Sequence, residues 1–236
     1  MQKIALLFLC SFVFFGVQAQ SILGAWESED IAENGEKLKH IATFTEDYHV
    51  FTTYNAASGE FFQTKGGAWN LEGDILIEKL EFHTTNPDFV GTEESSKVLV
   101  TDSALVMLDK DLKFTRIDNG KPGDLQGAWL MSGRVVDGEA QVRDTSGPRK
   151  TMKILSGTRF QWIAYNTDTK QFMATGGGSY TTINGEYTEN IEFFSRDNSR
   201  AGQSLKFNYS LRDGNWHHSG LSSKGDPIDE IWSLRD

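Results

Sequence analysis

The chain has 236 residues, of which 38% are hydrophobic and 12% aromatic, so it can bury one or two cores. Its formal net charge of −10 argues against a nucleic-acid ligand, because such ligands need clustered lysine and arginine side chains. The composition therefore excludes a disordered chain and indicates a globular protein without a nucleic-acid partner.

Residues 1–19 have the pattern of a secretory signal peptide. A lysine precedes an apolar run over residues 4–17, and Val-Gln-Ala at 17–19 meets the small-residue cleavage rule. The run is shorter than the ~20 apolar residues of a membrane span. We therefore expect cleavage before Gln20, no membrane span afterwards, and a secreted or periplasmic protein. Cleavage would also remove Cys10, the only cysteine, which excludes disulfides and thiolate chemistry in the mature chain.

An internal repeat organises the rest of the sequence. Residues 54–69 match residues 165–180 at a constant shift of 111, with six identities in sixteen positions. About one identity would be expected by chance. A Gly/Pro/Asn-rich segment, IDNGKPGD, separates the copies. We predict one module at residues 21–118 and a second at 124–236, joined by a linker over 119–123.

Each copy consists of short candidate strands and lacks helical periodicity. In the second copy, aromatic and β-branched residues alternate between turn signals such as Asn184-Gly185. The count of about eight strands per copy predicts an all-β fold of two tandem antiparallel up-and-down β-barrels. The three glycines at 176–178 are interpreted as a sharp bend or a close backbone approach, because no helix follows them as in a phosphate loop.

Motifs at the start of each copy match a known family. The copies open with LGAW at 23–26 and LQGAW at 125–129, and later strands carry Gly-x-Tyr or Gly-x-Trp followed by Glu-x-Ile-Glu-Phe or a close variant. In these features the chain resembles the lipocalin-like proteins common in Bacteroidetes secretomes, over nearly all of the mature chain as two copies. The resemblance implies β-barrels with an internal ligand cavity, and it carries over no catalytic residue.

A glutamate interrupts an apolar strand face in both copies. Strand alternation places Tyr187, Glu189, Ile191 and Phe193 on the interior face of the second barrel. Glu78 takes the position of Glu189 in the first copy. We therefore expect each barrel to bury one carboxylate.

Two roles for Glu189 follow from that burial. A buried carboxylate is costly unless it is paired or hydrogen-bonded. Glu189 therefore either forms a structural ion pair, for which Lys153 and Arg159 are candidate partners, or anchors a ligand in a pocket.

Aromatic and polar residues in the second copy suggest a binding site. Residues 215–220 (NWHHSG) align with ALVMLD of the first copy, so the second barrel is expected to be the more polar. Aromatic walls with a few polar groups are typical of small-molecule sites, although each aromatic side chain could instead fill the core. The candidate ligand-binding residues are Trp162, Tyr180, Tyr187, Glu189, Trp216, His218 and Trp232.

We expect an exported protein that holds a small, partly apolar molecule in the C-terminal barrel, without a cofactor. A metal site is not expected, because the adjacent His217 and His218 point to opposite faces of a strand. Catalytic motifs and a facing carboxylate pair are missing, which favours binding over catalysis. Two alternatives remain: an acid-base enzyme using Glu189 and His218, and a cell-surface interaction module without a cavity ligand.

The leader sequence makes a direct prediction. Mature protein purified from its native host should begin near Gln20, because the signal peptidase would cleave after the small residue at position 19. Intact-mass measurement and N-terminal sequencing test this. Recovery of the uncleaved chain from the inner membrane would contradict it.

Overall fold

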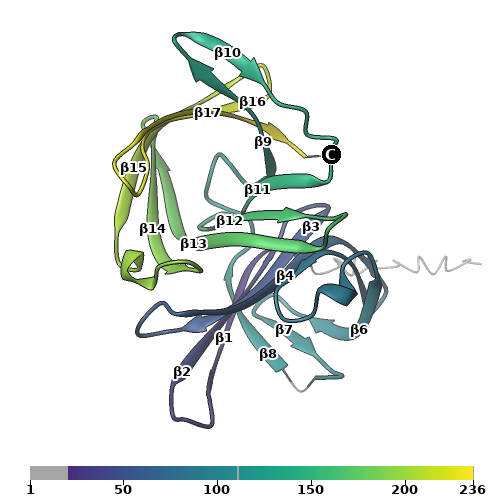
Figure 1. Cartoon of the computed structure of the whole chain (residues 1–236). Helices are drawn as coiled ribbons and strands as arrows, with labels where there is room; N and C mark the ends of the chain where they lie inside the picture. Colours follow the sequence, from purple (N-terminus) through teal and green to yellow (C-terminus); the bar gives the residue numbers. More distant parts are fainter. Residues whose placement is uncertain (1–20, 111, 236) are drawn as a thin grey trace, which may run out of the picture.

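The computed structural model describes residues 21–110 and 112–235, and the predicted signal peptide lies outside these ranges. The described chain folds into two antiparallel β-barrels in tandem, which confirms the predicted fold class (Figure 1). Within the same ranges, the two helical segments are short 3₁₀ turns, and neither has the length or apolar character of a membrane-spanning helix.

The first barrel is an up-and-down sheet in which β8 returns to pair with β1. A single 3₁₀ turn in its described residues, η1 (Pro87–Phe89), lies between its fifth and sixth strands. The strands are β1 (Gly24–Ile31), β2 (Lys37–Phe44), β3 (Tyr48–Asn55), β4 (Phe61–Glu72), β5 (Ile75–His83), β6 (Glu93–Val100), β7 (Ala104–Met107) and β8 (Leu112–Asp118).

The second barrel repeats this order and closes by pairing of β17 with β9. Its strands are β9 (Gly127–Val136), β11 (Arg149–Leu155), β12 (Arg159–Asn166), β13 (Gln171–Ile183), β14 (Glu186–Phe194), β15 (Ser204–Arg212), β16 (Asn215–Leu221) and β17 (Pro227–Leu234). Sequence analysis missed β10 (Glu139–Val142), an exposed strand that forms a hairpin with the end of β9. A 3₁₀ turn, η2 (Asn198–Arg200), matches η1.

The glycine run marks a β-bulge that occurs at the same place in both barrels. The register shifts between Gly177 and Gly178, and in the first barrel between the repeat-related Gly66 and Gly67. A Cβ on Gly178 would lie 1.9 Å from the carbonyl oxygen of Asn190, so only glycine fits there. The interpretation as a close backbone approach is confirmed.

This bulge corrects the predicted face of Phe193. The pairing of β13 with β14 skips Glu192, so strict alternation ends there. Ile191 remains in the core of the second barrel, whereas Phe193 stacks on Tyr54 of the first barrel at a centroid distance of 4.8 Å. The prediction of an interior Phe193 was wrong, because one extra residue moves the following side chain to the other face.

The two barrels pack through their outer faces with approximate twofold symmetry. The hydroxyl of Tyr54 donates a hydrogen bond of 2.5 Å to Glu192, and that of Tyr165 donates one of 2.5 Å to Glu81. The shift of 111 relates the two tyrosines to each other and the two glutamates to each other. Such an exchange of equivalent contacts is the pattern of an isologous dimer interface, here within one chain.

Each tyrosine–glutamate contact includes an arginine, and both arginines belong to the second copy. Arg159 binds Glu192 of its own barrel, with one nitrogen–oxygen distance of 2.8 Å. Arg235 reaches across to Glu81 of the first barrel at 2.6 Å and lies over the ring of Tyr48 at 4.0 Å. The interface is therefore symmetric in its tyrosines and glutamates but not in its cations.

Polar side chains and a loop contact fix the remaining geometry of the interface. The buried amide nitrogen of Gln161 donates to Thr64 at 3.1 Å and to the repeat-related Thr175 at 2.9 Å. At the end of β8, the carboxylate of Asp118 accepts hydrogen bonds from the backbone nitrogens of Gly157 and Thr158 in the second barrel. The segment joining the barrels is thus anchored at its start.

A pH-dependent contribution of Glu192 to stability is expected. Although burial raises the pKa of Glu192, hydrogen bonds and charge from Arg159 lower it overall from its usual 4.5. A carboxyl whose pKa is lower in the folded state stabilises the fold above its unfolded pKa, and this stability is lost as pH falls through the folded value. Glu192→Gln should lower the free energy of unfolding by about 1 to 3 kcal/mol at pH 7.

Urea unfolding of both proteins at several pH values below 7 measures this effect. The difference between wild type and Glu192→Gln should shrink as pH falls below 4.5, because wild type then becomes protonated as well. Glu93→Gln, which removes an exposed carboxylate, serves as the matched control and should leave stability nearly unchanged. A pH-independent difference for Glu192→Gln would contradict the prediction.

Candidate functional site

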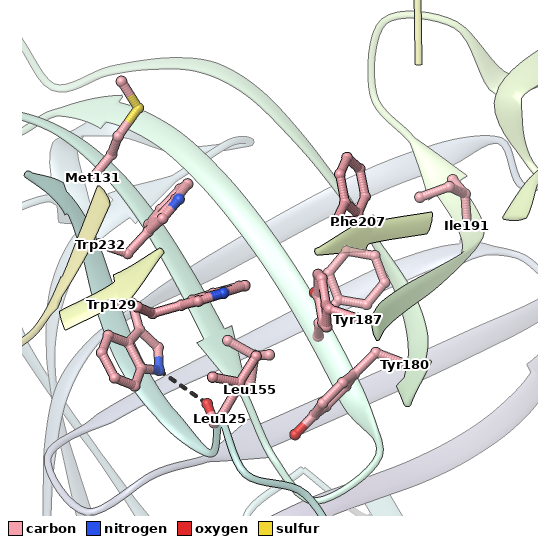
Figure 2. Packing of buried hydrophobic residues seen from close by; sticks show 11 residues of the cluster. Leu125, Trp129, Met131, Leu155, Tyr180, Tyr187, Ile191, Phe207 and Trp232 are labelled. Carbon is pink, nitrogen blue, oxygen red and sulfur yellow. Dashed lines mark hydrogen bonds between the residues drawn. The ribbon is translucent and has the colours of Figure 1, made fainter. Parts of the chain in front are cut away.

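The seven candidate residues of the second barrel do come together in its interior, but they fill it. Tyr180, Tyr187, Trp216 and Trp232 belong to one buried cluster, and Trp162 packs against it. Figure 2 shows the labelled rings of this cluster converging from several strands, with Trp129 held by a hydrogen bond to the carbonyl of Leu125. These aromatic side chains therefore form the core of the second barrel.

A buried ion pair lies at the centre of this core. The ammonium nitrogen of Lys153 is 2.7 Å from a carboxylate oxygen of Glu189, and both side chains are only 6% exposed. The rings of Tyr187, Phe207, Trp216 and Trp232 surround the ammonium at 5.0 to 5.9 Å. Of the two roles considered for Glu189, the structure contains the ion pair with Lys153, while Arg159 pairs with Glu192.

His218 pairs with Glu230 and not with Glu189. Its ring nitrogen Nδ1 lies 3.3 Å from Glu230, and its ring makes edge-on or tilted contacts with Tyr187, Phe207 and Trp216. Burial and the nearby Lys153 ammonium lower the pKa of His218, so the ring is neutral at pH 7. Glu189 and His218, which we considered as an acid-base pair, therefore contact other partners, Lys153 and Glu230.

A cavity of about 420 Å³ lies inside the first barrel. Apolar and polar side chains share its wall, and three of its charged groups, Lys65, Glu78 and Glu94, lie on β4, β5 and β6. The lining residues are Asp30, His40, Phe51, Thr52, Thr53, Gln63, Thr64, Lys65, Glu78, His83, Glu94, Met107, Lys110, Leu112 and Phe114. Sequence reasoning did not select this barrel.

Differences between equivalent positions explain why one barrel is open and the other filled. Leu105 pairs with Phe114 across β7 and β8, where Trp216 pairs with Trp232 across β16 and β17. The larger tryptophan rings occupy volume that the smaller side chains leave free. The tryptophans of the second copy were visible in the sequence. We interpreted these aromatic side chains as the wall of a ligand cavity, whereas they fill the interior of the barrel.

Further exchanges act in the same direction. Equivalent strand pairings place Ser96 where the second barrel has Phe207, and Phe51 where it has Trp162. Each exchange removes bulk from the interior of the first barrel. The repeat alignment could have shown this if the summed side-chain volumes of the two copies had been compared.

A charged network lies in the wall of the cavity. Lys65 is 2.6 Å from Glu94 and 3.5 Å from Glu78, and the His49 ring nitrogen Nε2 is 3.4 Å from Glu78. Glu78 and His49 are fully buried, whereas Lys65 and Glu94 are about one-fifth to one-quarter exposed. Two carboxylates thus share one lysine.

The histidines near this network are neutral at pH 7. Burial lowers the pKa of His49 to about 4, and this effect outweighs the nearby Glu78 charge. Burial and the Lys65 charge also lower the pKa of His83. For Glu94, burial raises the pKa, but the hydrogen bond and charge of Lys65 lower it overall, so the carboxylate is ionised. The described residues contain no cluster of three or more His, Cys, Asp or Glu arranged to hold a metal ion.

A second hollow of about 480 Å³ lies in the crevice between the barrels. Residues of both copies line it, including Phe44, Tyr48, Lys121, Leu155 and Arg235. Arg235 is committed to the interface through Glu81 and Tyr48. The crevice therefore belongs to the packing of one barrel on the other.

One family model matches the second barrel. Residues 124–234 match the model of a family described as a domain of unknown function, DUF4488. The match spans all strands from β9 to β17 and none of the first barrel. No curated protein matches the chain.

Removing one partner of the Lys153–Glu189 pair should destabilise the second barrel. Glu189→Gln leaves the Lys153 ammonium buried without its counter-charge and should lower the free energy of unfolding by about 3 to 5 kcal/mol. Adding Lys153→Met removes the stranded charge and should recover much of that loss. Denaturant unfolding of wild type, the single variant and the double variant tests this, and a fully stable single variant would contradict it.

Proposed function

We propose that the protein is an exported, lipocalin-like binding protein that holds a small, partly apolar molecule inside its first barrel. The observation that carries the proposal is the cavity of about 420 Å³, which lies within the usual range of small-molecule sites. Small eight-stranded barrels can enclose one ligand of this kind. The leader pattern of residues 1–19 supports export.

The opening motif of each module supports the lipocalin-like assignment. The indole nitrogen of Trp26 donates to the carbonyl of Ile22 at 2.8 Å, and that of Trp129 donates to Leu125 at 2.9 Å. Both tryptophans are buried near the start of the first strand of their barrel, β1 or β9. The Arg116 guanidinium lies over the Trp26 ring at 3.8 Å. One end of the first barrel is thus packed, and a ligand would enter from the other.

The cavity favours the first barrel over the C-terminal barrel expected from sequence. In the C-terminal barrel, Lys153 and four surrounding rings take up the centre, and opening it would require breaking a buried ion pair. In the first barrel, Phe51, Met107 and Phe114 line an open interior with charged groups nearby. We assign the second barrel the role of a rigid support.

Filling the cavity should abolish binding. Phe51→Trp and Phe114→Trp introduce the side chains that the second barrel carries at the same positions, so each should reduce the space while preserving the fold. A metabolite library screened by thermal shift should yield compounds that stabilise wild type. At one hundred times its Kd, a ligand stabilises the folded state by about 2.7 kcal/mol.

The matched control for this screen is a change in the other barrel. Trp162→Phe reverses the Phe51→Trp exchange in the second barrel and should leave ligand-induced stabilisation intact. A compound whose effect survives both first-barrel substitutions but disappears with Trp162→Phe would move the site to the second barrel. A library without any stabilising compound would argue against the binding function.

A further inference from the structure

Glu78 has an unsatisfied carboxylate oxygen in the wall of the first-barrel cavity. The side chain is fully buried, and no donor among the described residues hydrogen-bonds its Oε1. Lys65 makes its short contact, 2.6 Å, with Glu94; it donates a long hydrogen bond of 3.5 Å to Oε2 of Glu78 and lies 3.5 Å from Oε1. His49 lies 3.4 Å from Oε1 without a hydrogen bond. A buried anionic oxygen of this kind requires a donor.

The second barrel contains the missing donor as part of its own chain. Glu189, the equivalent of Glu78, receives the Lys153 ammonium at 2.7 Å. In the sheet, Lys153 pairs with Trp129 and Trp162. The residues at the equivalent positions of the first barrel, Trp26 and Phe51, pair with Ala42. The first barrel thus keeps the carboxylate but replaces the lysine with alanine.

We propose that the first barrel binds a small molecule that carries a primary ammonium group on an apolar body, with the ammonium against Glu78. This inference rests on the proposed function and specifies its ligand class. The ligand ammonium would take the place that the Lys153 ammonium takes in the second barrel, and the apolar body would contact Phe51, Met107 and Phe114.

The charge balance of the cavity also favours a cation. Its wall carries three carboxylates, Asp30, Glu78 and Glu94, against two lysines, Lys65 and Lys110. The lining therefore carries one more carboxylate than lysines. An anionic ligand would add to this excess, whereas an ammonium ion neutralises it. Aromatic rings such as Phe51, which already lies 5.7 Å from the Lys65 ammonium, also tolerate a cation nearby.

Three probes of similar shape and different charge test the proposal on the full mature chain. Calorimetric titration should show that 2-phenylethylamine binds about tenfold or more tightly than 2-phenylethanol, with 3-phenylpropanoate the weakest. Glu78→Gln should weaken binding of the amine by about tenfold or more and leave binding of the alcohol within about twofold. Glu93→Gln, which removes an exposed charge from β6, should change neither.

Ala42→Lys provides a second test that leaves Glu78 in place. It introduces an ammonium where the second barrel has Lys153, so it should abolish binding of the amine probe and raise the thermal stability of the unliganded protein. Circular dichroism verifies that each variant is folded. Undiminished binding of the amine to folded Ala42→Lys would overturn the proposal.

The results separate this inference from the proposed function. If the alcohol binds as tightly as the amine, and Glu78→Gln changes neither affinity, the ammonium site is rejected while binding in the cavity stands. If no probe binds, the ammonium site is also rejected, and the library screen with Phe51→Trp and Phe114→Trp decides separately whether the cavity binds any ligand.

Discussion

A carboxylate buried inside each barrel is the constraint on which the two interiors depend. Glu78 and Glu189 occupy the same position on β5 and β14, and both side chains are almost completely removed from solvent. Burying a charge is unfavourable unless a partner compensates for the lost hydration. The second barrel meets this need with Lys153 and encloses the pair in aromatic rings. The first barrel distributes one lysine, Lys65, over two carboxylates and keeps an open interior.

The interface explains how one barrel can remain open in a stable chain. A cavity lowers stability because its lining loses packing contacts. The first barrel packs its outer face on the filled second barrel through Tyr54, Glu81 and their repeat equivalents, with both arginines supplied by the second copy. The second copy thus combines a dense core with the cations of the interface. Contacts with this filled barrel therefore offset part of the packing that the first barrel loses to its cavity.

The sequence predicted the architecture well because its signals are local or repeated. Turn dipeptides, alternation and the shift of 111 were sufficient for two antiparallel barrels. The hairpin strand β10 was missed because it has only four residues and its side chains are all exposed. The face of Phe193 was predicted wrongly because one residue in the bulge changes the alternation, and a bulge requires knowledge of the partner strand.

The interior of a barrel was harder to predict than its strands. Trp216 and Trp232 were correctly placed in the interior, but whether interior aromatics surround a space or fill it depends on the sum of volumes across all eight strands. Lys153 was identified as a candidate partner of Glu189, since charge pairing is a chemical requirement that sequence can express. The decisive comparison lies between the copies: the first barrel has Ala42 in place of Lys153 and keeps Glu78, so this carboxylate has only the longer 3.5 Å contact with Lys65, which it shares with Glu94. Duplication allows this difference, because the second copy keeps the short ion pair while the first copy leaves its carboxylate to the ammonium ligand that we propose.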